Sequence, residues 1–400
     1  YQPQYRNYPS QKMIKFVPTL LLLLLVTFSC QTKEEPKEIA QYIEPIPVNP
    51  YEVKFEKLPK EYVAEKEQKI AQFYQDVIAN DGFSGGFLVA QNGEIIYENY
   101  NGYINYKSKE EMTNETPVHL ASISKVITAV VILQLVDEKL LDLDQKVTSL
   151  FPEFPHETIT IRMLLNHRSG LPHYSYFSEN KNIWNSNKTL TNQIILDLLS
   201  TKGIPLEYKP NSRFSYCNTN YALLALVVEK ITQLDFKTAV KKRVFEPLEM
   251  NNSFVLDFEN QQELASLTYK STWQKVPLDH LDAIYGDKNI YSTPRDLLKL
   301  DLALYSDAFI SKATKEEAFK GYSYEKKGVK NYGLGIRLNE FDNGETIHYH
   351  NGWWHGNTTS YVTLKKEKVT IIALANKYTK KVYQAKRLAS LFGDYPFELD

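Results

Sequence analysis

The order of strand-like and helix-like segments limits what this chain can fold into more than any other feature. Near residue 86, two apolar segments flank Asn92-Gly93, a pair typical of β-hairpin turns. Residues 120–310 have mainly helical patterns with loops between them. Strand-like segments return near the C-terminal end, at residues 346–350, 358–364 and 369–375.

Strands at both ends with helices between them predict an α+β fold. We expect one antiparallel sheet built from both chain ends, with flanking helices packed on it. An all-helical lobe, about residues 120–310, would be inserted into the α/β part. The folded domain is expected to span residues 61–400. A helix over 64–80 would open it, and a helix over 379–391 would close it.

The first 60 residues have the pattern of a targeting signal followed by a flexible tether. Met13-Ile14-Lys15 precedes an apolar run from Phe16 to Phe28, which ends at Ser29-Cys30. This order predicts a signal peptide within residues 1–29. A cysteine directly after a small residue resembles a bacterial lipoprotein signal, in which Cys30 would carry the lipid. Residues 30–60, rich in Glu, Lys and Pro, are predicted to be a disordered tether.

A lipid on Cys30 would hold the protein at a membrane of the cell envelope, on a periplasmic or outer-membrane face. Simple secretion and an uncleaved anchor are the alternatives. Cys217, the second of two cysteines, is expected to be a small buried side chain, because two thiols make no disulfide framework.

Composition and motif content exclude several classes of function. A net charge of -1 gives no basic face for nucleic acid. The chain has no C-x-x-C or H-E-x-x-H pattern, so we expect no metal, and no cofactor is implied. The 28 tyrosines and 19 phenylalanines suit strands and half-buried surfaces. A surface that binds sugar or peptidoglycan is the alternative reading.

Ser122 and Lys125 open the most apolar helical segment of the chain. Residues three apart on a helix share a face, so the two side chains can touch. The helix N-terminus favours a developing oxyanion, and burial favours a neutral lysine that can accept the serine proton. Ser122 as a helix N-cap is the alternative. Ser124 lies on the wrong face, and the same pattern at Ser178 and Ser323 lies in polar stretches.

The run His119-Leu-Ala-Ser122-Ile-Ser-Lys125 resembles the first motif of the serine β-lactamase and penicillin-binding-protein-like hydrolases. The closest branch contains class C β-lactamases, D-Ala-D-Ala carboxypeptidases and esterases. The resemblance covers about residues 65–390. Further similar stretches are Leu141–Asp144, Ile159–Leu171, Tyr291–Leu297 and Tyr332–Gly335.

The resemblance implies the remaining site residues. Tyr216-Cys217-Asn218 matches the family's Tyr-x-Asn motif. Tyr216 would share proton transfer with Lys125, and Asn218 would bind Lys125 or the substrate amide.

His350-Asn351-Gly352 is the only His-x-Gly of the chain and stands where the family has Lys-Thr-Gly or His-x-Gly. His350 would bind a substrate carboxylate or polarise the hydroxyl network. Gly352 would let substrate approach the backbone. The backbone N–H groups of Trp353 and Ser122 would form the oxyanion hole. His348 and His355 are expected to be structural.

Three other residues invite catalytic readings that their context disfavours. His167 could suggest a Ser-His-Asp triad, and Ser84 fits the formal Gly-x-Ser-x-Gly pattern. That motif needs a strand, a sharp turn and a helix in this order, whereas here a helix comes first and a strand follows. Asp287 is expected to be part of a loop.

The sequence therefore predicts an exported serine hydrolase that forms an acyl-enzyme with an amide or an ester. D-Ala peptides, other peptides or amides, and esters are all open as substrates, with peptidoglycan as one source. The alternative is an envelope module that binds penicillin or peptidoglycan without turnover.

Overall fold

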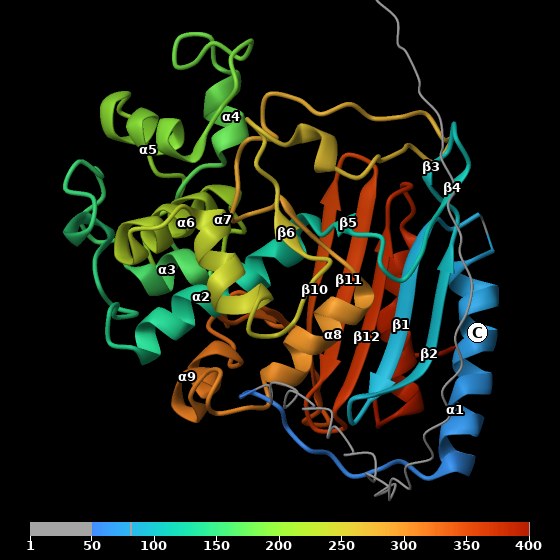
Figure 1. Cartoon of the computed structure of the whole chain (residues 1–400). Helices are drawn as coiled ribbons and strands as arrows, with labels where there is room; N and C mark the ends of the chain where they lie inside the picture. The colour runs from blue at the N-terminus through green and yellow to red at the C-terminus, as the bar shows by residue number, and fades with distance from the viewer. Residues whose placement is uncertain (1–49, 81, 400) are drawn as a thin grey trace, which may run out of the picture. The chain divides into compact units, whose positions relative to one another are not determined.

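The computed structural model describes residues 50–80 and 82–399. Its main element is a seven-stranded antiparallel sheet with the order β2-β1-β12-β11-β10-β9-β8 (Figure 1). The bounds are β1 Gly85–Gln91, β2 Glu94–Asn101, β8 Lys330–Tyr332, β9 Arg337–Glu340, β10 Thr346–Trp354, β11 Asn357–Leu364 and β12 Val369–Ala375.

The first and last strands of the described residues, β1 and β12, pair with each other inside this sheet. Gly85 of β1 lies opposite Ala375 of β12, and the pairing runs to Gln91 opposite Val369. The predicted hairpin joins β1 to β2 through Asn92 and Gly93, whose φ angles of 53° and 76° are left-handed, as the tight turn requires. The pairing of β1 with β12 therefore joins residues that are very far apart in the sequence.

Alternate residues of the central strands enter two different cores. Ile371 and Ala373 of β12 pack with α1 (Lys60–Phe73), the short helix η1 (Tyr74–Ile78) and η6 (Lys381–Leu391). Ile372 and Leu374 face the other core, which holds α2 (Ser124–Asp137) and α8 (Pro294–Ala303). Burial on both faces explains why β12 reads as a continuous apolar run. The predicted last helix is thus present, but as a 3₁₀ helix that begins at Lys381.

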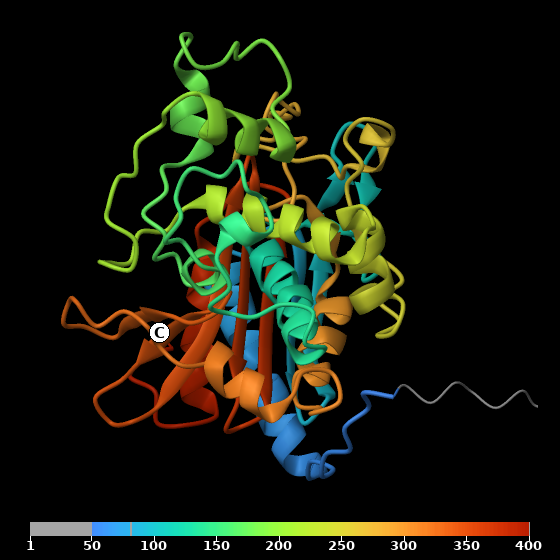
Figure 2. The same ribbon diagram turned by 90° about the vertical axis from the view of Figure 1, so that its left-hand side faces the viewer.

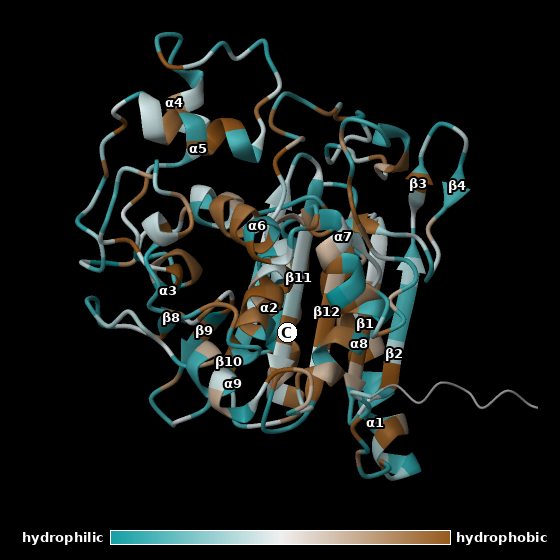
Figure 3. Cartoon of the chain, turned by 60° about the vertical axis from the view of Figure 1, so that its left-hand side comes forward, coloured by the Kyte–Doolittle hydropathy of each residue, from teal (hydrophilic) through white to brown (hydrophobic). Residues whose placement is uncertain are grey.

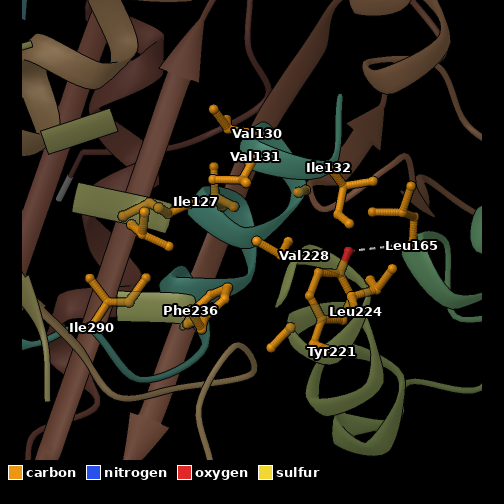
Figure 4. Packing of buried hydrophobic residues seen from close by; sticks show 14 of the residues in the cluster. Ile127, Val130, Val131, Ile132, Leu165, Tyr221, Leu224, Val228, Phe236 and Ile290 are labelled. Carbon is orange, nitrogen blue, oxygen red and sulfur yellow. Dashed lines mark hydrogen bonds between the residues drawn. The ribbon is translucent and has the colours of Figure 1, made fainter. Parts of the chain in front are cut away.

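The region between the two groups of strands is mainly helical and faces the viewer in Figure 2. Helix α2 is buried through most of its length and is brown through most of its turns in Figure 3. It packs on α6, and Figure 4 shows Val131 and Ile132 of α2 beside Tyr221 and Val228 of α6. The other helices are α3 Ile161–Leu165, α4 Tyr174–Glu179, α5 Asn192–Thr201, α6 Asn218–Thr232, α7 Phe236–Val240 and α9 Lys312–Ala318, with the short turns η3 Val147–Ser149, η4 Lys241–Phe245 and η5 Gln262–Leu264.

Short strands also occur within and beside this region. The expectation of an all-helical lobe is therefore wrong in this detail. The strands β6 (Phe254–Val255) and β7 (Ile290–Ser292) pair with β5 (Val118–His119) in a small sheet of order β5-β7-β6. Strands of two or three residues carry too little periodicity to be recognised in a sequence. A further pair, β3 (Tyr103–Asn105) and β4 (Glu110–Glu111), extends from the hairpin.

The predicted tether is too long at its C-terminal end. The rings of Tyr51 and Phe309 are 5.0 Å apart, and those of Phe55 and Tyr305 are 5.4 Å apart. These edge-on aromatic contacts fasten residues 50–59 to the folded domain, although the segment is rich in Glu and Lys. The predicted signal peptide, Cys30 and the rest of the tether lie outside the described residues. No helix in the described ranges is long and apolar enough to cross a bilayer.

The packing of α2 on α6 predicts a large effect of truncation at Ile132, which is fully buried. Ile132→Ala should lower the free energy of unfolding by about 2–5 kcal/mol, because it removes buried methyl groups and leaves a cavity. Leu140→Ala is the control, since Leu140 is 52% exposed and should change stability by no more than about 0.5 kcal/mol. Urea unfolding of both variants tests this, and equal losses would contradict the packing.

Candidate active site

The candidate nucleophile lies in a tight turn that leads into α2. Residues Ala121–Ile123 form a 3₁₀ turn, η2, and α2 follows from Ser124. Ala121 has a left-handed φ of 49°, which costs energy for a residue with a Cβ atom. Its backbone N–H donates to Nδ1 of His119 at 2.9 Å, which helps to hold the turn. No side-chain cap is present at either helix start, so Ser122 does not act as an N-cap.

Lys125 is fully buried and points at Ser122. Its Nζ donates to Ser122 Oγ at 2.9 Å and to the backbone carbonyl of Asp287 at 2.9 Å. The rings of Tyr216 and Tyr221 lie 5.0 and 5.9 Å from Nζ. Among the residues that the structure describes, Lys125 has no carboxylate partner. The amine is therefore held by neutral acceptors and aromatic rings, which leaves it able to exchange a proton with the serine.

Tyr216 lies just before α6 and borders both Lys125 and two other basic groups. The guanidinium of Arg337 lies 4.6 Å from the Tyr216 ring centroid, and the His167 ring lies 4.4 Å away. Asn218, the first residue of α6, has a buried Oδ1 with no hydrogen-bond partner in the described part of the chain. Among the described residues, the hydrogen bonds of Lys125 go to Ser122 and Asp287 and not to Asn218, so the alternative expectation, that Asn218 binds the substrate amide, stays a prediction.

His350 is enclosed by the protein, with both ring nitrogens engaged. Nδ1 lies 2.8 Å from the carbonyl of Asn351, which can only accept, so Nδ1 carries the proton. Nε2 then accepts from the hydroxyl of Tyr332 at 3.0 Å. Burial, with the nearby charges of Arg337 and Lys125, holds the pKa of His350 well below its usual range. The imidazole is neutral and orders Tyr332, so this arrangement does not present His350 to a substrate carboxylate.

Gly352 is needed for a different close approach from the one expected. A Cβ atom there would lie 2.6 Å from the carbonyl oxygen of Leu120 and 2.9 Å from Cβ of Ala121. The missing side chain thus lets β10 pass against the turn that carries Ser122. Trp353 follows on β10, and its indole is 66% exposed. The strand and the turn are in contact, and Trp353 directly follows the glycine at which the turn comes close.

A buried ion pair behind Lys125 was missed by sequence reasoning. Asp287 and Lys288 are 1% and 3% exposed, and their charged atoms are 3.6 Å apart. The hydroxyl of Tyr174 donates to Asp287 Oδ2 and accepts from Lys288 Nζ at 2.9 Å. Asp287 therefore supports the site and does not only form a loop. Its backbone carbonyl accepts from Lys125, and its carboxylate is held by Tyr174 and Lys288. Only Gly286-Asp287 marked this place in the sequence, and it gave no sign of the distant partners.

The residues set aside as nucleophiles have structural partners. Ser124 is buried and accepts from the backbone N–H of Ile290 at 3.2 Å, and Ser84 donates to Asn376 at 2.7 Å. Ser178 donates to the carbonyl of Ser175, and Ser323 accepts from Arg168. Burial raises the pKa of the Cys217 thiol to about 11, so this cysteine is a poor nucleophile.

His348 and His355 also have protein partners. His348 Nε2 lies 2.8 Å from the carbonyl of Phe319, and His355 Nε2 lies 2.8 Å from Asp282 Oδ2. With Asp279, Asp282 and His355 form the one group of possible metal ligands found in the described ranges. The Asp282 carboxylate there already accepts from Trp354 Nε1 at 2.7 Å and from the backbone of Asp279 at 2.6 Å. These hydrogen bonds fix the position of the Asp282 carboxylate.

Comparison with known proteins identifies the family of this chain. The model of the Beta-lactamase family matches residues 69–392, so the chain belongs to that family, and it is a serine hydrolase by this membership. Penicillin-binding protein 4* of Bacillus subtilis is 31% identical over 357 residues, which cover 84% of this chain and 78% of that protein.

Solved structures agree in fold. The octameric penicillin-binding protein homologue from Pyrococcus abyssi matches with a TM-score of 0.69 at 26% identity, over 84% of this chain and 78% of that chain. The D-amino acid amidase from Ochrobactrum anthropi has a TM-score of 0.65 at 23% identity, over 82% of this chain and 99% of that chain. The resemblance predicted from the motifs, and the predicted fold class, are confirmed.

The buried histidines near the site predict a stability that falls in acid. Burial lowers the pKa of His348 from 6.5 to about 4. Between these values the unfolded chain binds a proton that the folded chain lacks, so the free energy of unfolding decreases as the pH falls from 6.5 toward 4. At pH 5 this one residue should lower the free energy of unfolding by about 2 kcal/mol.

His348→Gln removes this titration and keeps an amide donor near the carbonyl of Phe319. Its unfolding midpoint should depend less on pH between pH 7 and 5 than that of the wild type. His280→Gln, at a partly exposed position, serves as the control and should keep the wild-type slope. An unchanged slope for His348→Gln would show that His348 is not responsible.

Proposed function

We propose that this protein is an exported hydrolase that cleaves an amide or an ester through an acyl-enzyme on Ser122. The observation that carries the proposal is the 2.9 Å hydrogen bond between a fully buried lysine amine and the Ser122 hydroxyl. The partly exposed position of Ser122 leaves the hydroxyl open to a substrate. Nucleophile and base are thus within reach before any substrate binds.

The first half of the reaction transfers the acyl group to the enzyme. Ser122 Oγ attacks the carbonyl carbon while its proton passes to the Lys125 and Tyr216 pair. The backbone N–H groups of Ser122 and Trp353 stabilise the oxyanion, which the close approach of β10 to the nucleophile turn supports. The tetrahedral intermediate then collapses, and the leaving amine or alcohol takes the proton from the same pair.

The second half releases the acyl group. Water attacks the ester on Ser122, its proton passes to the Lys125 and Tyr216 pair, and Ser122 Oγ leaves and regains its proton. Lys125 Nζ lies 5.0 Å from the ring centroid of Tyr216, which supports a role for Tyr216 in both halves. A peptide ending in D-Ala is the first substrate to try, because a relative at 31% identity carries the name penicillin-binding protein. No cofactor enters these steps.

Ser122→Ala should reduce hydrolysis of a chromogenic short-chain phenyl ester by at least ~10³-fold, because the covalent step is lost. Tyr216→Phe should reduce kcat by roughly 10²–10⁴-fold through loss of proton transfer. Steady-state rates of residues 31–400 and the two variants measure this.

The matched control is Ser124→Ala, which removes a hydroxyl two positions away that only accepts from the backbone of Ile290. This variant should keep turnover. Full activity of Ser122→Ala would refute the assignment. No activity in the wild type, together with a stable mass increase after penicillin treatment, would instead favour a module that binds without turnover.

Export and lipid anchoring at Cys30 are part of the proposal and rest on the sequence pattern alone. Full-length protein expressed in a bacterium should be recovered in the membrane fraction, and Cys30→Ala should move to the soluble fraction, because its lipid is missing. If Cys30→Ala stays in the membrane fraction, the apolar run at 16–28 acts as an uncleaved anchor.

A further inference from the structure

A large cavity beside the candidate active site has five cations among its thirteen lining residues. Its volume is about 890 Å³, within the range of sites that enclose whole small molecules. It lies between the segment that precedes Tyr216, the loop 323–329 and strands β8, β9 and β10. In Figure 2 the residues near 320–345 form the orange loops at the left edge of the molecule. The charged residues of its lining are Arg213, Lys326, Lys327, Lys330, Arg337 and Glu325.

The positive charge of this lining is not neutralised by the protein. Glu325, the one acid of the lining, forms an ion pair with Arg168. Within the ranges that the structure describes, none of the five cations forms an ion pair. The whole chain has a net charge of -1. Five cations around one cavity therefore make the local charge much more positive than the average of the chain. Like charges held together without counter-ions repel one another, and an anion would relieve that repulsion.

Arg337 joins this cavity to the catalytic residues. Its guanidinium lies 4.6 Å from the ring centroid of Tyr216 and 5.6 Å from that of Tyr332. The positive charge of Arg337 contributes to the lowered pKa of His350. Burial, with a smaller contribution from the charge of Lys330, lowers the pKa of Lys386. Arg337 therefore belongs both to the lining of the cavity and to the surroundings of Tyr216.

We propose that this cavity binds anionic groups of an extended substrate, carboxylates or phosphates, next to the acyl group that Ser122 attacks. The volume and the spread of cations suit an oligoanion better than one small ion. Guanidinium and ammonium groups bind both kinds of anion, and Phe214 adds an aromatic wall. This inference rests on the proposed function only in taking the bound anion to be part of a substrate. Binding of the anion itself needs no nucleophile.

Two small oligoanions test the site by isothermal titration calorimetry: inorganic tripolyphosphate and tricarballylate, a tricarboxylate. The wild type should bind at least one of them, and the triple variant Lys326→Gln, Lys327→Gln, Lys330→Gln should bind it roughly 10-fold or more weakly, because three charge contacts are lost. Binding of one probe alone identifies the kind of anion. Binding of both upholds the shared chemistry.

The matched control removes three exposed lysines that do not line the cavity: Lys146→Gln, Lys188→Gln, Lys202→Gln. It changes the net charge by the same amount and should keep the wild-type affinity. Equal weakening in both triple variants, or no binding to the wild type, would overturn the proposal. Unfolding midpoints close to the wild type show that each variant is folded.

Two further measurements separate this inference from the proposed function. Ser122→Ala should bind the probe as tightly as the wild type, because the nucleophile lies outside the cavity lining. The bound probe should inhibit ester hydrolysis by the wild type, and inhibition of the cavity variant should need a correspondingly higher concentration. Binding without inhibition would overturn the link to the substrate. Absence of turnover with intact binding would count against the proposed function alone.

Discussion

The buried amine of Lys125 depends on one acceptor from the adjacent turn and one from a loop far along the chain. Its hydrogen bonds go to Ser122 one turn away and to the carbonyl of Asp287, and the rings of Tyr216 and Tyr221 lie 5.0 and 5.9 Å from it. An amine without such partners would be costly to bury. The helix α2, the loop at 287 and the segment before α6 must therefore be held together before the serine and lysine can function as a pair.

The packing around this amine explains several features that otherwise look unrelated. The ion pair of Asp287 and Lys288, closed by the Tyr174 hydroxyl, holds the loop whose carbonyl receives Lys125. On the opposite side, β10 presses against the nucleophile turn, where Gly352 leaves room for the backbone. The left-handed φ of Ala121 is the local strain that such a tight turn requires, and the surrounding sheet and helix contacts hold it in place.

Much of the architecture could be predicted because its signals are local. The Asn92-Gly93 hairpin, the strands β11 and β12 and the apolar helix after Ser122 all appear close to the expected residues. The short strands β6 to β9 could not be recognised, since two to four residues carry almost no periodicity. The segment 50–59 was misread because its composition is polar, while two aromatic rings decide its packing.

The sequence by itself determined the family, the sheet built from both chain ends and the spacing that brings Ser122 onto the face of Lys125, because these depend on local periodicity and on short ordered motifs. Tertiary structure alone decided how His350 is used, why Gly352 is required, and that Asp287, Lys288 and Tyr174 support the site. It also decided that five cations meet around one cavity. Each of these depends on side chains from segments far apart in the chain, and such distances are set only when both cores are packed.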